Sequence, residues 1–318
     1  MSTPVVFLFS GKGSQYFHMG FSLYRRNKKF QRHVDRLDEI AKAVTGIQVV
    51  DRIFDSVARP LTAITDPELA VLSIFLVECA LANTLIDYDV LPSAIITSSM
   101  GIYAGAVTAG VLTEEAGFRY LHAASRIFRD ACEPGGLIAI LGTKEQFASS
   151  AVLQAHSVLA AVSLSSHISI AFPVRHEAEI EAELRRLGLS SQVLPISRAY
   201  HSHWIDTARR SFLELFAHEQ SREPIVPMNC VSANLKIAKF SGEAVWHAIR
   251  MPMYFQLKIE HIERQGSWRY VDVGPASSSA TLLKYCLPQG TDSTFHPVLS
   301  QFGDDEARLN YVLERVVS

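Results

Sequence analysis

Ser99 stands between a short apolar run and a segment of small residues, a setting in which a serine can act as a nucleophile. Residues 95–101 read Ile-Ile-Thr-Ser-Ser-Met-Gly, which predicts a strand, a tight turn at the serine and then a helix. The pattern approximates G-x-S-x-G, in which the serine oxygen is exposed on a strained turn. Gly101 holds the second glycine position, but Thr97 stands where the first would be. The predicted chemistry is acyl transfer through a serine ester.

A serine nucleophile needs a base within hydrogen-bonding distance, and a histidine distant in sequence is the usual choice. Residues 198–203 read Arg-Ala-Tyr-His-Ser-His, which makes His201 our candidate and His203 a weaker one. The sequence offers no clear acidic partner for the imidazole, although Asp206 is near. A backbone carbonyl would fix the tautomer equally well, so both alternatives stay open.

The oxyanion that forms during acyl transfer needs hydrogen-bond donors, and rigid backbone amides serve best. Met100 follows the serine at the start of the predicted helix, so its amide is one candidate. The loop at residues 11–15, Gly-Lys-Gly-Ser-Gln, follows an apolar run, and its Lys12 amide is the second candidate. We therefore expect these two amides to hold the oxyanion.

Apolar runs alternate with helical patterns along the chain, and this order predicts an α/β fold with a mostly parallel sheet. We expect strands at Val5–Phe9, Ala94–Ile96 and Val271–Val273, with helices at residues 17–44 and 69–85. The first strand enters the 11–15 loop, and the second leads to Ser99.

A second pattern of elements begins near residue 130. Strands are expected at residues 137–141, 168–172 and 192–196, with helices at 144–155 and 175–187. This β-α-β-α-β order within about 65 residues resembles a small ferredoxin-like insertion. We assign residues 1–129 and 195–318 to a large subdomain with an α/β-hydrolase-like core, and residues 130–194 to the small subdomain.

The composition fits a protein with a large buried core and excludes several classes of function. The 318 residues are 48% hydrophobic and carry a formal net charge of −2, which gives no reason to expect nucleic-acid binding. The four cysteines contain no C-x-x-C pair, so we expect buried thiols, no disulfides and no metal site. The apolar run at residues 5–9 is too short for a membrane span, and it lacks the charged start and the cleavage site of a signal peptide. We expect a cytoplasmic monomer without a membrane partner.

Four separated motifs occur in the order and spacing of one enzyme family. They are Phe9-Ser10-Gly11-Lys12-Gly13-Ser14-Gln15, Ser99 with Gly101, Tyr200-His201-Ser202 and Val273-Gly274-Pro275. The whole chain resembles the malonyl-CoA:acyl-carrier-protein transacylases and the acyltransferases of polyketide synthases. Its first residues look most like those of free-standing, trans-acting members, which include proofreading acyl hydrolases.

The resemblance implies a role for each residue that matches. Ser99 would be the acylated serine and His201 its base, with the amides of Met100 and Lys12 as the oxyanion hole. In the family a main-chain carbonyl orients the histidine, and here it would fall between residues 248 and 252. The residues that the resemblance places in contact with the substrate are Gly11, Ser98, Ala124 and Tyr200.

Departures from the family pattern bear on the acyl group. Malonyl-specific members carry an arginine that pairs with the malonyl carboxylate, and counting from Ser99 puts that position at Ala124. Arg126 is two residues further on and would point to a different helix face. A family glutamine maps to about Val71, again apolar. A carboxylate buried without its arginine pays a large desolvation penalty, so we expect acetyl or another neutral acyl group.

Several functions stay open. We favour hydrolysis of neutral acyl groups from an acyl carrier protein in polyketide biosynthesis, over transfer of an acyl or malonyl unit from CoA or a carrier protein to an acyl carrier protein. An inactive scaffold is a third alternative, because Ser98 and Ile102 replace a family histidine and glutamate. A lipase-like hydrolase would instead need a late histidine, and His296 is the one available. The acyl group would arrive on phosphopantetheine of the carrier or on CoA, with no bound cofactor.

A basic run between residues 25 and 32 has two interpretations. It is either a solvated helix face or a docking surface for an acidic carrier protein.

Overall fold

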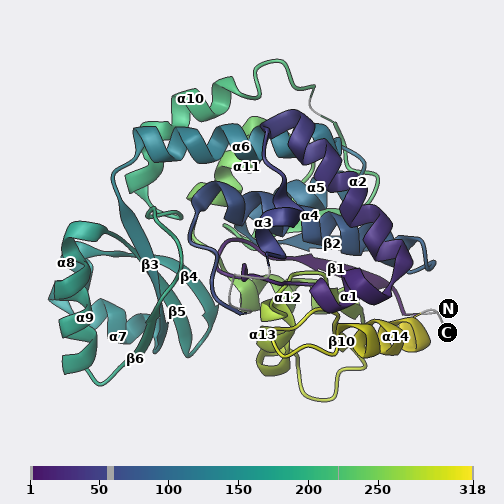
Figure 1. Cartoon of the computed structure of the whole chain (residues 1–318). Helices are drawn as coiled ribbons and strands as arrows, with labels where there is room; N and C mark the ends of the chain where they lie inside the picture. Colours follow the sequence, from purple (N-terminus) through teal and green to yellow (C-terminus); the bar gives the residue numbers. More distant parts are fainter. Residues whose placement is uncertain (1–2, 56–60, 221, 317–318) are drawn as a thin grey trace.

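Six strands among the described residues form a mostly parallel sheet in the larger part of the molecule (Figure 1). The structure is a computed structural model that describes residues 3–55, 61–220 and 222–316. The strand order is β10-β9-β1-β2-β7-β8, with β8 alone antiparallel to its neighbour among these described strands. The strands are β1 (Val5–Phe9), β2 (Ala94–Thr97), β7 (Met228–Cys230), β8 (Lys236–Ile237), β9 (Arg269–Asp272) and β10 (Thr294–Pro297).

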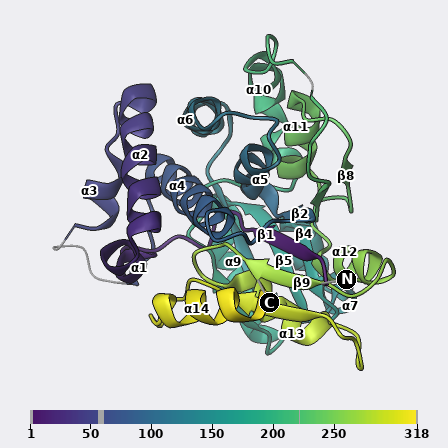
Figure 2. The ribbon, with the colours of Figure 1, turned by 90° about the vertical axis from the view of Figure 1, so that its right-hand side faces the viewer.

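Helices cover both faces of this sheet, which explains why β1 is apolar at every position. Val5, Phe7 and Phe9 belong to the core on the side of α2, α4, α5, α6 and α11, whereas Val6 and Leu8 pack toward α12 and α13. Figure 2 shows the two layers on either side of β1. The helices are α1 (Phe21–Arg26), α2 (Lys28–Thr45), α3 (Val49–Ile53), α4 (Pro67–Ile86), α5 (Ile102–Thr108), α6 (Glu114–Ala131), α10 (Arg209–Glu214), α11 (Gly242–Arg250), α12 (Phe255–Glu263), α13 (Ser278–Cys286) and α14 (Asp305–Val316), with short 3-10 turns η1 (Ser99–Gly101) and η3 (His203–Ala208).

The predicted α/β core is confirmed, but the helix expected over residues 17–44 is wrong, because α1 and α2 are separate. Asn27 lies between them with extended backbone, and its side chain accepts a hydrogen bond from the Phe30 amide. Asparagine is a strong N-cap. Its hydrogen bond therefore begins a new helix at Lys28, although the hydrophobic pattern of residues 17–44 shows no break there. The helix expected over residues 69–85 is α4, and the expected strands are β1, β2 and β9.

Helix α4 is a core helix. Asp66 caps its first turn through the amides of Glu68 and Leu69. Among the described residues it is the one helix long and apolar enough to cross a membrane, yet nearly all of it is buried inside the protein. Glu78 is a fully buried acid in the middle of this apolar helix. The four cysteines are also buried, and each is a free thiol as expected.

The small subdomain contains an antiparallel sheet in the order β4-β5-β3-β6. Its elements follow one another as βαββαβ, the connectivity of the ferredoxin-like insertion that we expected. Strand β4 was missing from the prediction, and the helix expected over residues 144–155 is split where Ser150 caps a second helix. The elements are β3 (Gly135–Leu141), α7 (Lys144–Ser149), α8 (Ala151–His156), β4 (Val158–Leu164), β5 (His167–Pro173), η2 (Val174–His176), α9 (Glu177–Arg186) and β6 (Ser190–Val193).

The two faces of the small sheet have different neighbours. Ile138 and Ile140 of β3, with Ile170 of β5, pack against α7, α8 and α9 in a separate apolar cluster. Successive strand residues point to opposite faces, so Leu137 and Ser169 face away from these helices. Both residues line the pocket that also contains Ser99.

Candidate active site

Ser99 lies at a sharp turn between β2 and α5. Its φ is 51°, in the left-handed region that is strained for a residue with a side chain. Neighbouring glycines allow the close packing that this turn needs. A Cβ on Gly101 would stand 2.4 Å from the Ser10 carbonyl oxygen, and one on Gly105 would stand 2.5 Å from Thr97. The local geometry is that of a nucleophile elbow.

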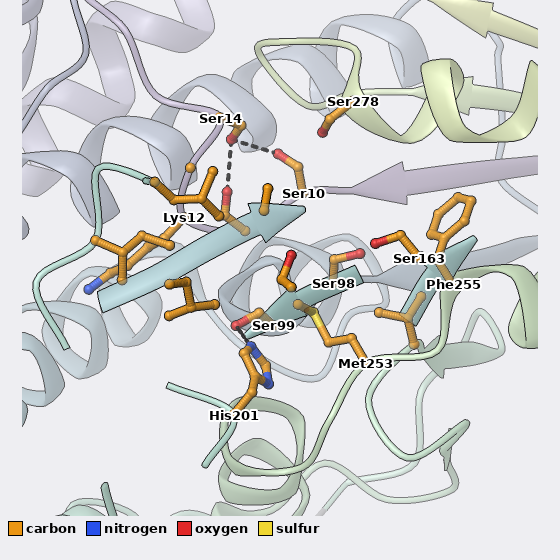
Figure 3. A pocket seen from close by; sticks show the side chains of 18 of the residues that line it. Ser10, Lys12, Ser14, Ser98, Ser99, Ser163, His201, Met253, Phe255 and Ser278 are labelled. Carbon is orange, nitrogen blue, oxygen red and sulfur yellow. Dashed lines mark hydrogen bonds between the residues drawn. The ribbon is translucent and has the colours of Figure 1, made fainter. Parts of the chain in front are cut away.

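The structure brings His201 to Ser99 from 102 residues away. Ser99 Oγ lies 2.9 Å from His201 Nε2 (Figure 3). His201 Nδ1 lies 2.7 Å from the Met251 carbonyl oxygen. Because a carbonyl only accepts, Nδ1 carries the proton and Nε2 is left to accept the serine O–H. Met251 falls within the 248–252 segment expected to orient the histidine.

The other candidates for the base and its partner lie elsewhere. Asp206 pairs with Arg250 and makes no contact with the imidazole. His203 is exposed at the start of η3. His296 is buried on β10 and hydrogen-bonds to Thr294. Among the described residues, His201 is the histidine that hydrogen-bonds to Ser99, so the late histidine that a lipase-like hydrolase needs is not at the serine.

His201 is 3% exposed, and this burial lowers its pKa to about 4, with a further lowering by the cationic Arg250. The hydrogen bond from Nδ1 to Met251 opposes the shift only partly. Burial disfavours the charged imidazolium. The imidazole is therefore neutral at neutral pH, which is the state that accepts a proton from serine.

The loop after β1 packs against the serine turn. A Cβ on Gly11 would lie 2.9 Å from the Ser98 carbonyl oxygen and 3.1 Å from Ser99 Cβ, so the loop approaches because residue 11 is glycine. Lys12 follows Gly11, and Met100 follows Ser99. Neither amide donates a hydrogen bond to any described residue, which leaves both available to an oxyanion.

A buried carboxylate fixes this loop from below. Glu78 Oε1 accepts hydrogen bonds from the Ser10 amide at 2.7 Å and from Ser10 Oγ at 2.8 Å. Ser10 Oγ also lies 3.0 Å from Ser14 Oγ, and Ser14 donates to the Gly11 carbonyl. Burial raises the pKa of Glu78 well above its ordinary value. In the sequence, the one sign of this hydrogen-bond network is that Glu78 is an acid within an otherwise apolar helix. We did not predict a role for Glu78 from the sequence.

Lys12 and Tyr200 connect the two loops that carry the candidate residues. Lys12 Nζ donates to the Tyr200 hydroxyl at 3.0 Å and lies 4.6 Å from the centre of its ring. Tyr200 precedes His201. Lys12 therefore braces the histidine loop against the loop after β1.

A pocket of about 340 Å³ surrounds Ser99 and His201 and is enclosed by both parts of the chain. Seven of the eight predicted site residues line it, namely Gly11, Lys12, Ser98, Ser99, Met100, Tyr200 and His201. Ala124 does not, because it lies fully buried in the core on α6, so its assignment to substrate contact needs correction. The small subdomain adds lining residues that sequence reasoning missed: Leu137, Ala139, Ser163, His167, Ser169 and Gln192.

The space behind Met100 is almost closed. A cavity of about 10 Å³ is left there, enough for one water at most, and its walls are mainly apolar, with Val71, Phe75 and Leu121 among them. In the main pocket Lys12 is the only lining side chain with a permanent charge among the described residues. Neither space offers an arginine to a substrate carboxylate.

The basic run on α1 and α2 is largely paired within the chain. Lys29 donates to the Asp87 carbonyl and lies over the Tyr88 ring, and Arg32 pairs with the Asp87 carboxylate. Arg26 contacts Glu306. These contacts favour the solvated-face interpretation.

Comparison with known proteins decides the family. Residues 6–305 match the acyl transferase domain family. The chain belongs to this family. The resemblance that the four motifs indicated is thereby confirmed.

Two relatives match this chain over nearly their whole length. The polyketide biosynthesis acyltransferase homolog BaeD of Bacillus velezensis is 29% identical, covering 100% of this chain and 98% of its own. The corresponding PksD of Bacillus subtilis is 28% identical, covering 98% of this chain and 96% of its own. Among solved structures, the acyl transferase domain of SpnD in complex with 2-(pent-4-yn-1-yl)malonyl has a TM-score of 0.86 at 25% identity, covering 100% of this chain and 76% of that chain.

Proposed function

We propose that this acyltransferase-family protein acts in trans in polyketide biosynthesis and hydrolyses neutral acyl groups from acyl carrier proteins. The observation that carries the proposal is the pocket at Ser99, which has no arginine for a substrate carboxylate among its described lining residues. The mainly apolar space behind Met100, about 10 Å³, is too small for a carboxylate. A neutral acyl group avoids the cost of burying an unpaired charge.

The proposed reaction has two steps. Ser99 Oγ attacks the thioester carbonyl while His201 Nε2 takes the serine proton, and the amides of Lys12 and Met100 hold the oxyanion. The C–S bond breaks, and the thiol of the carrier's phosphopantetheine leaves with the proton from His201. Water then attacks the acyl-serine ester with His201 as base. The acid is released, and Ser99 regains its proton.

The test follows the fate of the acyl group by intact mass of carrier and protein. Acetyl-, butyryl- and malonyl-carrier protein are each incubated with the protein and with an unloaded second carrier. We expect free acetate and butyrate, an unloaded first carrier and no loading of the second. Ser99→Ala is the matched control, and we expect it to lose roughly 10⁴-fold or more in rate.

The alternatives predict other products. Transfer of malonyl to the second carrier would show an extender-unit transferase and contradict the proposal. Transfer of acetyl to the second carrier would keep the neutral acyl group but replace hydrolysis by transfer. No reaction with any substrate, and no labelling of Ser99 by a fluorophosphonate probe, would favour the inactive scaffold.

A further inference from the structure

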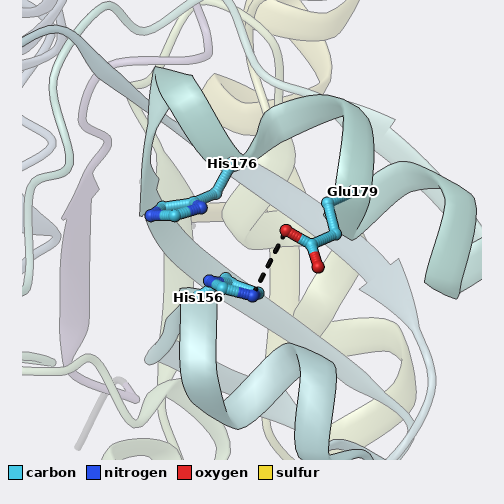
Figure 4. Close-up of side chains that lie close together, drawn as sticks. All are labelled: His156, His176 and Glu179. Carbon is cyan, nitrogen blue, oxygen red and sulfur yellow. Dashed lines mark ion pairs between the residues drawn. The ribbon is translucent and has the colours of Figure 1, made fainter.

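Three metal-ligating side chains come together on the helical side of the small subdomain (Figure 4). His156 is the last residue of α8, His176 ends η2, and Glu179 lies in the first turn of α9. None of the three lines the pocket at Ser99. They are separated by up to 23 positions in the sequence, and no C-x-x-C or H-x-x-H pattern marks them, so we predicted no metal site from the sequence.

The geometry of the three side chains already approaches that of a metal site. His156 Nε2 lies 3.2 Å from Glu179 Oε2. The His156 and His176 rings stack with centroids 4.3 Å apart and planes at 25°. One ligand atom from each residue can be chosen so that all lie within 4.8 Å of one another.

Zinc is bound by imidazole nitrogen and carboxylate oxygen at about 2.0–2.2 Å in tetrahedral geometry, which places neighbouring ligand atoms roughly 3.4 Å apart. The histidine–glutamate pair is near that spacing. His176 has to move by up to about 1.4 Å and turn its ring out of the stack, because each imidazole must aim an in-plane nitrogen at the ion. The histidines are half-buried and Glu179 is exposed, so the side chains have room to turn. Two neutral imidazoles and one carboxylate give a net charge of −1, which attracts a divalent cation.

We propose that His156, His176 and Glu179 bind one zinc ion, with water in the fourth position. His156 stands just before β4 and His176 just after β5, so the ion would join the two ends of the β4–β5 hairpin. The opposite face of that hairpin supplies Ser163, His167 and Ser169 to the pocket. Zinc would therefore stabilise the small subdomain without touching the reacting atoms.

The test uses the full chain without an affinity tag, titrated with zinc chloride at pH 7.5 against a chromophoric chelator. We expect one zinc per chain with micromolar affinity and a rise in the thermal midpoint, because a ligand that binds only the folded state stabilises it. His156→Ala and His176→Ala should each weaken binding by about tenfold or more. His261→Ala, at an exposed histidine on α12, is the matched control and should bind zinc as the unaltered chain does.

Absence of zinc binding, or equal affinity in both cluster variants and the control, would overturn the proposal. Circular dichroism of each variant separates loss of ligands from loss of fold, and the readout is independent of any activity at Ser99.

Discussion

At the scale of single residues, the neutral His201 sets the pH dependence of Ser99. Its pKa is lowered to about 4 by burial, so the imidazole accepts a proton at any pH well above that value. We expect the rate of fluorophosphonate labelling of Ser99 to stay nearly flat from pH 8 to about 5 and to fall only toward pH 4. A loss of labelling with a midpoint near 6.5 would show an unperturbed histidine.

The same shift makes the fold less stable in acid. Between pH 6.5 and about 4 the unfolded chain protonates this histidine while the folded chain does not, so unfolding is favoured as pH falls through that window.

Two variants of Lys12 test its backbone amide and its side chain separately. Lys12→Pro removes the amide hydrogen, and we expect thioester turnover to fall by roughly 10²–10³-fold, the effect of losing one oxyanion donor. Lys12→Ala keeps the amide and loses only the contact with Tyr200, so its turnover should stay much closer to normal. Equal turnover in the two variants, both folded by circular dichroism, would remove the Lys12 amide from the oxyanion hole.

Glu78 should affect the reactivity of Ser99, because it accepts hydrogen bonds from Ser10 at the start of the loop that packs against the serine. Glu78→Ala leaves the Ser10 amide and hydroxyl without their acceptor, and we expect a loss of about 1–3 kcal/mol in the free energy of unfolding. Labelling of Ser99 should also slow, because the Gly11–Lys12 loop is freed. Glu78→Gln keeps an acceptor oxygen and should be milder in both measurements, urea unfolding and labelling rate. If Glu78→Gln is as damaging as Glu78→Ala, the charge rather than the acceptor is what matters.

At the scale of elements, the serine turn depends on contacts that only glycine allows. Gly101 has φ −60°, so alanine there has no conformational penalty, but its Cβ would meet the Ser10 carbonyl oxygen at 2.4 Å. We expect Gly101→Ala to lower the free energy of unfolding by about 1–3 kcal/mol and to slow labelling of Ser99. Gly188→Ala is the comparison: nothing lies within 4 Å, but φ is +67°, so alanine strains the backbone there without crowding a neighbour. It should leave labelling of Ser99 unchanged, even if stability falls.

Strands β1 and β2 were predictable because they are buried at every position and almost wholly apolar, and β9 was found by its place before Gly274-Pro275. Strands β7, β8 and β10 of the same sheet were not predicted, because they are short and contain polar residues. The elements that escaped prediction have weaker patterns. Strand β4 is only half-buried at most positions and contains alanines and a serine. The breaks at Asn27 and Ser150 come from side-chain caps, which local hydrophobic periodicity does not register. The type of an element was thus readable where a longer run of apolar residues is buried, as in β1, whereas the three-residue β7 was missed although it is fully buried.

At the scale of the whole molecule, the site forms where parallel strands end. Loops after β1 and β2 carry Lys12 and Ser99, and the loop after β9 leads to Ser278 and Ser279, all of which line one pocket. Ligands in open α/β sheets bind at this edge. The motifs allowed the serine, histidine and loop to be named from sequence. The lining supplied by the small sheet, and the position of Ala124 outside the pocket, depended on packing between distant elements and were not readable.

The central claim is that Ser99 takes a neutral acyl group and not a malonyl group. Its most direct test is rapid acid quenching of the protein with acetyl- or malonyl-carrier protein, followed by peptide mass mapping of the trapped ester. We predict an acetyl ester on Ser99 that forms within one turnover and decays to free acetate, with no malonyl ester. A malonyl ester on Ser99, or an acetyl group mapped to another residue, would contradict the account.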